Sequence, residues 1–391
     1  MPQVHSEMES SARIRVVGIG GSGKNALNHM VTSKVKGVDF LVINTDAQDL
    51  QQSTARAKIH IGKNLTRGLG AGMNPAVGKR AAEETQAEIQ EALRGSDMVF
   101  IAGGMGGGTC TGASPVVARI AKESGALTVA VVTKPFSFEG QQRMRLAEQG
   151  LDELRKEVDA LIVIPNDRLL AVVDSATSVK NAFAMCDEVL RQAVEGVSDL
   201  ITTPGNINLD FADIKAIMED AGSALMGVGL STGDKRAEEA ARLAINSPLL
   251  DISINGAKGV LLSIAGGEDL GLLEVQAAAQ IVTESIDKNA KVIFGTSKDE
   301  RLKKGEIRVT VIATGFPDDA TAARQGASLF QLGAKKDKKE EEAVAKTYTP
   351  APVREEEPVL QKQEPAAKPL SPDDDDDWGA VPAFLRRSKR N

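Results

Sequence analysis

The sequence predicts an α/β protein built on a parallel sheet with helices on both faces. Short apolar segments alternate with helical ones through residues 13–333, as in repeated βαβ units. The apolar segments are hydrophobic along their whole length, which is typical of strands buried on both faces. Glycine-rich loops join several of these strands to the following helices, as tight strand-to-helix turns require.

Five strands are expected in the first half of the chain. They span Arg13–Val17, Asp39–Asn44, Asp97–Ala102, Leu127–Thr133 and Ala160–Pro165. Helices are expected between them, at Lys24–Thr32, Pro75–Arg94 and Pro115–Glu123. A longer helix follows at Ser178–Ile201, and its apolar residues recur at three-to-four spacing. Its length and apolar stripe indicate a central connector rather than a surface helix.

A second, smaller α/β domain is expected after this connector, because chains usually split into domains beyond roughly 250–300 residues and this one has 391. Its helices are expected at Phe211–Ala221, Lys235–Asn246 and Leu272–Ile286, and its strands near Val260–Ala265, Lys291–Ile293 and Ile307–Ala313. The expected order is a flexible N-terminus (1–12), a first domain (13–177), the connecting helix (178–202), a second domain (203–318), a disordered charged linker (319–377) and a terminal peptide (378–391).

The composition changes near residue 334. Residues 334–391 hold 7 of the 15 prolines, 25 charged residues and one of the 37 glycines. Segments such as KKDKKEEEAVAK and KPLSPDDDDD cannot bury a core, so this stretch predicts a disordered linker. The ending differs, because Trp378, Phe384 and Leu385 lie between an acidic run and a basic one.

Charge and composition exclude several function classes. Lys and Arg total 47 against 54 Asp and Glu, a net charge of −7, which argues against a nucleic-acid binder. Two cysteines supply no disulfide framework or cysteine zinc cluster, and all three histidines lie before residue 61. Catalysis must therefore use carboxylates, backbone amides, basic side chains or a metal. No apolar run reaches the ~20 residues that span a bilayer, and no apolar signal region begins the chain, so we expect a cytoplasmic protein without a transmembrane segment.

The first glycine loop, GIGGSGKN at 18–25, follows a strand and precedes a helix. It matches the dinucleotide fingerprint GxGxxG, with Asp46 near the position of a ribose-binding acid. It also nearly matches a Walker loop, but Asn25 replaces the hydroxyl that binds magnesium. Taken alone, this loop fits a structural turn and a phosphate site equally well.

Two further glycine clusters favour the phosphate site. GGMGGGTCTG at 103–112 also follows a strand and precedes a helix, and RGLGAG at 67–72 precedes another helix. Such runs are costly in conformational entropy unless backbone must come close to a ligand. Amides at a helix N-terminus, with the hydroxyls of Thr109 and Thr111, form an anion cradle. Three such loops suit a polyphosphate better than one pyrophosphate.

The second loop resembles the GGGTGTG signature of the tubulin-like GTPases, and further stretches resemble the FtsZ family of bacterial cell-division GTPases in the same order. They are GIGGSGKNA (18–26), INTDAQDL (43–50), TRGLGAGMNP (66–75), TKPFSFEGQQR (133–143), IPNDRLL (164–170) and the acid motif at 208–213. The resemblance covers roughly residues 13–318 and the extreme C-terminus. It implies a tubulin/FtsZ-like fold, in which the long helix joins a GTP-binding domain to a C-terminal GTPase-activating domain.

The resemblance also implies where GTP or GDP binds. The glycine loops and neighbouring strand ends are expected to hold the nucleotide through Gly20, Gly21, Ser22, Gly23, Asn25, Asn44, Gly70, Ala71, Gly72, Gly104, Met105, Gly106, Gly107, Gly108, Thr109 and Thr133. Glu139 and Arg143 are expected on the ribose and phosphate side. Asn166 and Asp187 are expected to read guanine, with Phe183 against the base. Without the resemblance, Phe183 fits core packing and Arg143 fits a solvated face.

The catalytic residues that the resemblance implies are Asn208, Asp210 and Asp213. The residues alone favour another role, because Asp210 can cap a helix that starts at Phe211 and Asp213 lies in its first turn. In the family this loop enters the nucleotide pocket of the next subunit, where its acids position the attacking water together with Mg²⁺. Such a head-to-tail contact does not close on itself and implies filaments.

Two residues depart from the family pattern. Cys110 replaces a glycine of the signature loop and is expected beside the phosphates, where a helix start favours the thiolate. Lys24 lies where the first loop is usually uncharged, and it is expected either to favour phosphate or to point into solvent.

The terminal peptide resembles the family's docking segment for membrane-anchoring division proteins and regulators. The expected contacts are Val381, Pro382, Phe384, Leu385, Arg386 and Arg387. The leading prediction is therefore a GTP-hydrolysing filament subunit of the division ring, assembling at midcell beneath the inner membrane. The alternatives are a tubulin-like GTP-binding filament protein without a division role and a Rossmann-type NAD-dependent oxidoreductase.

Overall fold

The computed structural model describes residues 12–170, 178–203, 207, 209–247, 253–267, 269–299 and 301–316. By its internal contacts the chain divides after Gln331, and every described residue belongs to the first unit, Met1–Gln331. The terminal-peptide residues, the linker and Asn208 lie outside the described residues. Within the described part, no helix is long and apolar enough to cross a membrane.

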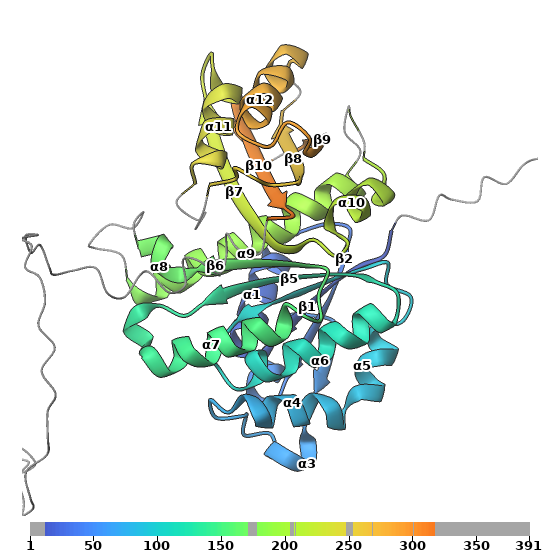
Figure 1. Ribbon diagram of the computed structural model, residues 1–391. Helices are drawn as coiled ribbons and strands as arrows, with labels where there is room; N and C mark the ends of the chain where they lie inside the picture. Colours follow the sequence, from blue (N-terminus) through green and yellow to red (C-terminus); the bar gives the residue numbers. More distant parts are fainter. Residues whose placement is uncertain are drawn as a thin grey trace, which may run out of the picture. The chain divides into compact units, whose positions relative to one another are not determined.

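The strands of this unit form one sheet in the order β3-β2-β1-β4-β5-β6-β7-β10-β8-β9 (Figure 1). The first six are β1 (Ile14–Ile19), β2 (Val38–Asn44), β3 (Ala57–His60), β4 (Met98–Gly104), β5 (Leu127–Lys134) and β6 (Ala160–Pro165). All of their pairings are parallel, so their carboxyl ends meet at one edge. This confirms the predicted parallel sheet.

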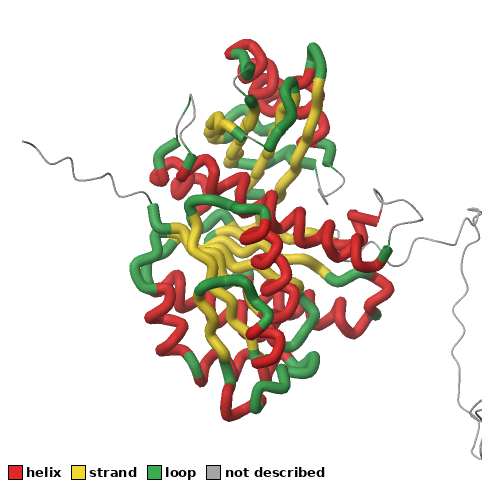
Figure 2. The backbone as a smooth tube through the Cα atoms, turned by 180° about the vertical axis from the view of Figure 1, so that it is seen from behind, coloured by secondary structure: helices red, strands yellow, loops and turns green. Residues whose placement is uncertain are grey.

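Helices cover both faces of the parallel part (Figure 2). They are α1 (Gly20–Thr32), α2 (Ala47–Gln51), α3 (Lys63–Thr66), α4 (Pro75–Glu84), α5 (Gln86–Leu93), α6 (Thr109–Glu123), the 3₁₀ turn η1 (Ser137–Glu139), α7 (Gln141–Leu154) and α8 (Asn166–Leu169). Successive β4 side chains enter opposite cores, as the period of a strand requires. Met98 and Phe100 pack with α1 and α9 (Val179–Thr202), whereas Val99 and Ile101 pack with α4–α7.

The second part of the unit continues the same sheet. Its elements are α10 (Phe211–Met218), β7 (Gly222–Thr232), α11 (Arg236–Ile245), β8 (Gly259–Gly266), α12 (Leu272–Glu284), β9 (Lys291–Lys298) and β10 (Glu306–Thr314). The start of β7 pairs with β6 in parallel, and β7 from Ala224 to Thr232 pairs antiparallel with β10. One strand therefore connects the two predicted domains, which sequence patterns had not indicated.

Several predicted helices differ from the expected bounds, and two of these differences have a clear cause. The helix expected at Pro75–Arg94 breaks at Thr85, whose hydroxyl donates to the Ala81 carbonyl and accepts from the Gly62 amide. The helix expected from Pro115 already begins at Thr109, because its first turn forms part of the second glycine loop.

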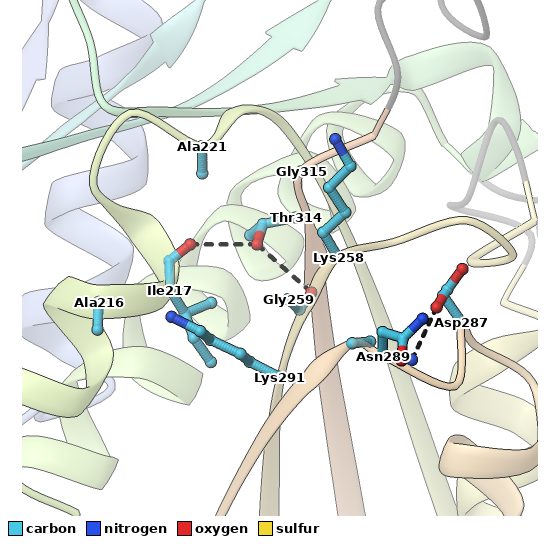
Figure 3. A pocket seen from close by; sticks show the side chains of 11 residues that line it. Ala216, Ile217, Ala221, Lys258, Gly259, Asp287, Asn289, Lys291, Thr314 and Gly315 are labelled. Atoms are coloured by element: carbon cyan, nitrogen blue, oxygen red, sulfur yellow. Dashed lines mark hydrogen bonds between the residues drawn. The ribbon is translucent and has the colours of Figure 1, made fainter.

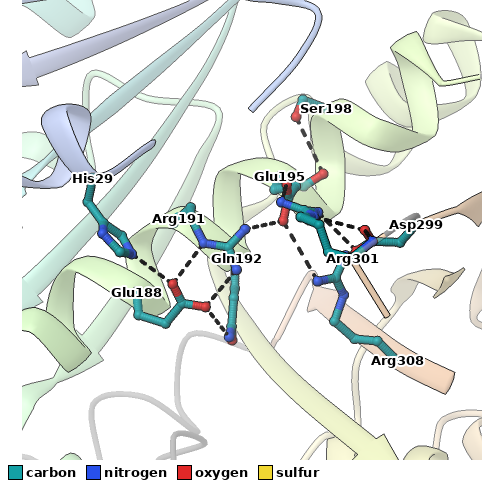
Figure 4. A network of polar contacts seen from close by, with 9 residues as sticks. All are labelled: His29, Glu188, Arg191, Gln192, Glu195, Ser198, Asp299, Arg301 and Arg308. Atoms are coloured by element: carbon teal, nitrogen blue, oxygen red, sulfur yellow. Dashed lines mark hydrogen bonds and ion pairs between the residues drawn. The ribbon is translucent and has the colours of Figure 1, made fainter. Parts of the chain in front are cut away.

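A chain of ion pairs fixes α9 to both parts of the unit (Figure 4). On one side, Glu188 binds Arg191 and accepts from His29 of α1 at 2.8 Å. On the other side, the buried Glu195 lies 2.5 Å from Arg301, next to β10. Since removing one partner of a buried ion pair leaves an uncompensated charge, these contacts favour a fixed position of α9. The helix is the central connector that the sequence predicted.

Candidate functional site

The first two glycine loops lie side by side at the carboxyl edge of β1 and β4. The Gly104 amide donates to the Ser22 hydroxyl at 2.7 Å. A Cβ on Gly20, whose φ is +72°, would lie 3.4 Å from the Cys110 nitrogen and be strained besides. The left-handed backbone of position 20 therefore favours glycine, and the two loops lie within van der Waals contact of each other.

The third glycine cluster packs against the second. A Cβ on Gly108 would lie 2.8 Å from the Asn74 nitrogen and 3.0 Å from the Ala71 carbonyl oxygen. By contrast, Cβ atoms on Gly72 or Gly107 would have no neighbour within 4 Å. The three clusters thus converge around open space, at the N-termini of α1 and α6. Amides at the helix N-termini and the helix dipoles make such a place favourable for phosphates.

Aromatic side chains lie further along the carboxyl edge of the sheet, beyond the end of β5. The ring of the fully buried Phe136 contacts Phe183 of α9 edge-on, with centroids 5.4 Å apart. Phe183 itself is 41% exposed, so simple core packing does not describe it. Nearby, Asn166 starts α8 and is only 4% exposed, yet its Oδ1 has no hydrogen-bond partner among the described residues. A buried amide oxygen without a partner points to a ligand that donates to it.

Glu139 and Arg143 form a pair between these two regions. Arg143 Nη1 lies 2.9 Å from Glu139 Oε2, and Glu139 Oε1 accepts from the Phe136 amide at 2.9 Å. The Arg143 side chain is 40% exposed, but its Nε is buried without a partner within the described residues. A position on a solvated face therefore does not fully describe Arg143, because its Nε is available to donate to a ligand.

Asp187 and Glu188 are neighbours on α9 with opposite electrostatics. Burial raises the pKa of Asp187 to about 6, although the charge of His29 acts in the other direction. Burial would also raise the pKa of Glu188, but hydrogen bonds from Arg191 and His29 bring it down to about 2. The carboxylate of Asp187 therefore lacks the cationic hydrogen-bond donors that neutralise Glu188.

The predicted catalytic acids lie far from the aromatic side of the site within one chain. Asp210 is the N-cap residue of α10, but its side chain makes no capping hydrogen bond, and Asp213 lies in the first turn. Both residues are exposed. The 24 residues of α9 lie between the aromatic side of the site and this loop, a span of about 36 Å along the helix. In Figure 1, α8 and α10 accordingly lie at opposite ends of α9.

Comparisons with known proteins agree with this arrangement. The family model "Tubulin/FtsZ family, GTPase domain" matches residues 13–174, and "FtsZ family, C-terminal domain" matches residues 222–317. An empty FtsZ dimer from M. jannaschii is 49% identical with a TM-score of 0.76, covering 79% of this chain and 89% of that one. This chain belongs to the FtsZ family. A mutant form of M. jannaschii FtsZ is equally similar, at 49% identity and a TM-score of 0.76 over 78% of this chain and 92% of that one.

More distant solved structures share the fold. A GTPgS-bound protofilament of CetZ2 from Haloferax volcanii is 20% identical with a TM-score of 0.67, covering 79% of this chain and 96% of that one. Membership of the FtsZ family makes the chain a GTPase with a guanine-nucleotide site, and it removes the oxidoreductase alternative. Consistently, the Asp46 side chain accepts from the Asp49 amide at 2.9 Å and caps α2, so it is no ribose-binding acid here.

Lys24 and Cys110, the two residues that depart from the FtsZ pattern, do not lie where the sequence predicted. Lys24 neither faces phosphate nor points into solvent, because it is only 6% exposed and its Nζ lies 2.5 Å from Asp49 Oδ1. Cys110 is buried with its sulfur turned beneath Gly103, and burial raises the pKa of the thiol to about 11. The expected thiolate beside the phosphates is therefore wrong, because the helix start orients the Cys110 side chain into the core.

Two strand-end residues that were expected to bind nucleotide are buried. Asn44 is 2% exposed, donates to Asp49 Oδ2 at 2.8 Å and accepts from the Thr45 amide at 2.8 Å. Thr133 is 5% exposed, and its carbonyl accepts from the Met105 amide at 2.9 Å. In this FtsZ-family chain, both residues hold the loops in place.

A separate pocket of about 510 Å³ lies away from the glycine loops, between the end of α10 and the ends of β8, β9 and β10 (Figure 3). Its Thr314 hydroxyl lies between the carbonyls of Ile217 and Gly259, at 3.2 and 3.4 Å. These bonds tie α10 to the second part of the sheet. Within the described residues, no group of three or more His, Cys, Asp or Glu side chains is arranged to hold a metal ion.

Proposed function

We propose that this FtsZ-family GTPase hydrolyses GTP at the interfaces of a head-to-tail filament that forms the division ring. The observation that carries the proposal is the separation of the aromatic side of the site from Asp210 and Asp213 by the length of α9. One subunit presents the loops, and the next presents the acids. Because the two surfaces differ, the contact repeats without closing and produces a filament.

In each subunit, GTP lies along the carboxyl edge of the sheet. Its phosphates accept from amides at the N-termini of α1 and α6 and from the third glycine cluster, and Glu139 and Arg143 lie toward the ribose. Guanine lies between Asn166 and Asp187, against Phe183. The partnerless Asn166 Oδ1 and Arg143 Nε fit such a ligand, since each gains the hydrogen bond that it lacks. Mg²⁺ is bound mainly through phosphate oxygens and waters, as is usual for nucleotide sites.

Hydrolysis requires little covalent chemistry from the protein. Positioning of water and stabilisation of charge supply most of the catalysis of phosphoryl transfer. The exposed carboxylates of Asp210 and Asp213, brought by the neighbouring subunit, orient and polarise the attacking water. Asn208 of the same loop contributes a further polar contact.

We expect GTPase activity per subunit to rise from near zero as protein concentration increases, because an isolated subunit has only half of each site. Phosphate release and light scattering should be followed together after GTP and Mg²⁺ are added to a dilution series. The two signals should rise at the same concentration. Constant specific activity down to high dilution would contradict an active site shared between subunits.

We also propose that the terminal peptide attaches the filament to membrane-anchoring division proteins through Phe384 and Leu385, with the basic residues after them adding attraction. Deleting residues 378–391 should leave GTPase activity and polymerisation unchanged and abolish recruitment to midcell, as seen with a fluorescent fusion. Normal rings formed by the deletion variant would refute this role.

A further inference from the structure

The ion pair of the buried Lys24 and the half-buried Asp49 lies next to the first glycine loop. Lys24 belongs to α1, immediately after Gly23, and Asp49 belongs to α2. Asp49 Oδ1 lies 2.5 Å from Lys24 Nζ, and Asp49 Oδ2 accepts from the Asn44 side-chain Nδ2 at 2.8 Å. The side chains are 7% and 26% exposed. The pair thus joins the start of α1 to the end of β2.

Asp49 lies unusually close to the loop for a negative charge. Its Oδ2 is 3.5 Å from the position that a Cβ on Gly21 would occupy. Loops that bind phosphates favour anions through their amides and the helix dipole, and a carboxylate beside such a loop opposes that effect. Among the described residues, Lys24 is the cation that pairs with Asp49.

We propose that Lys24 and Asp49 together set the affinity of the loop for nucleotide phosphates. Lys24 shields the phosphates from the Asp49 carboxylate, and Asp49 holds the Lys24 ammonium away from the phosphates. They act as positioning residues through charge, without contacting the nucleotide. The inference rests on the proposed binding of phosphates at Gly20–Gly23.

This role differs from simple structural support in the sign of its effects. If the pair only stabilised the loop, removing either partner would weaken nucleotide binding. If it balances charge, Lys24→Met exposes the phosphates to an uncompensated carboxylate, whereas Asp49→Asn exposes them to an uncompensated ammonium. The two single variants should therefore change affinity in opposite directions, and the double variant should lie between them.

The test is calorimetric titration of the full chain with GDP and with GTP, at protein concentrations below assembly. We expect Lys24→Met to weaken GTP binding about tenfold, the effect of one charge roughly 10 Å from several phosphate charges at an intermediate effective dielectric. Asp49→Asn should tighten it severalfold, and Lys24→Met/Asp49→Asn should bind within about twofold of wild type. Each change should be larger for GTP than for GDP and smaller at high salt.

Lys156→Met provides a matched control, because it removes an exposed lysine just before β6, at the opposite edge of the sheet, and should leave both affinities unchanged. Thermal unfolding of each variant shows that it is folded, and the double variant keeps the test valid if a single variant is unstable. Equal weakening by both single variants, or no difference from wild type, overturns the inference and leaves the proposed function standing. Failure of the wild type to bind GTP or GDP overturns both.

Discussion

Replacing Asp213 with alanine should reduce GTP hydrolysis by about a hundredfold while GTP binding and filament formation persist. The magnitude is that of removing a group which positions or polarises a nucleophile in a preorganised site. Asp213 is exposed in the first turn of α10, and its carboxylate has no hydrogen-bond or ion-pair partner within the described residues. The fold should therefore tolerate its removal, apart from a helix-dipole term of roughly 0.3–1 kcal/mol.

Single-turnover phosphate release measures the chemical step separately from assembly, which light scattering records. Glu219→Ala is the matched control, because it removes a carboxylate just beyond the other end of α10, where Glu219 lies 3.5 Å from Lys215. Its turnover should equal that of wild type. Undiminished hydrolysis by Asp213→Ala would show that Asp213 only stabilises the N-terminus of α10.

The sequence predicts those parts of the fold that depend on local patterns. The strand expected at Ala160–Pro165 has those bounds in the structure, and the long helix differs by one residue at each end. Strand β7 was missed because GSALMGVGLST contains little of the β-branched and aromatic residue content that marks strands. Its glycines serve packing instead, since a Cβ on Gly229 would lie 2.0 Å from the Ala240 carbonyl of α11.

The sequence predicted the parts of the site that are formed by backbone atoms. It predicted less well which side chains are buried and what they contact. Glycine runs between strand and helix identify the phosphate edge, because a Cβ at Gly103 or Gly108 would collide with neighbouring backbone. The burial of Lys24 depended on a contact with Asp49 across 25 positions, and that of Cys110 on how its sulfur packs beneath Gly103. No local pattern specifies such contacts, since propensities and periodicities describe neighbours in sequence.

Changing Asp187 to asparagine should weaken GTP binding by at least about a hundredfold, since two hydrogen bonds to a charged group are worth roughly 1.5–3 kcal/mol each. A carboxylate accepts from both the N1–H and the 2-amino group of guanine, whereas an amide oxygen and amine cannot. Xanthine carries a carbonyl at C2, to which the asparagine amine donates. Asp187→Asn should therefore bind xanthosine triphosphate more tightly than GTP, a gain that a misfolded variant would not show. Loss of both ligands would contradict the assignment.

The same residue should make GTP binding dependent on pH. Because burial raises the pKa of Asp187 to about 6 and guanine requires the carboxylate, affinity should be full above that pH and should fall below it, approaching about tenfold per pH unit. Bound guanine favours the carboxylate, so the pKa of Asp187 should be lower in the complex than in the free protein. Titrations with GDP between pH 7.5 and 5 measure this directly. Asp187→Asn removes the titrating group, so its binding of xanthosine diphosphate should lack this component. A wild-type affinity that stayed constant across this range would contradict a hydrogen bond between Asp187 and guanine.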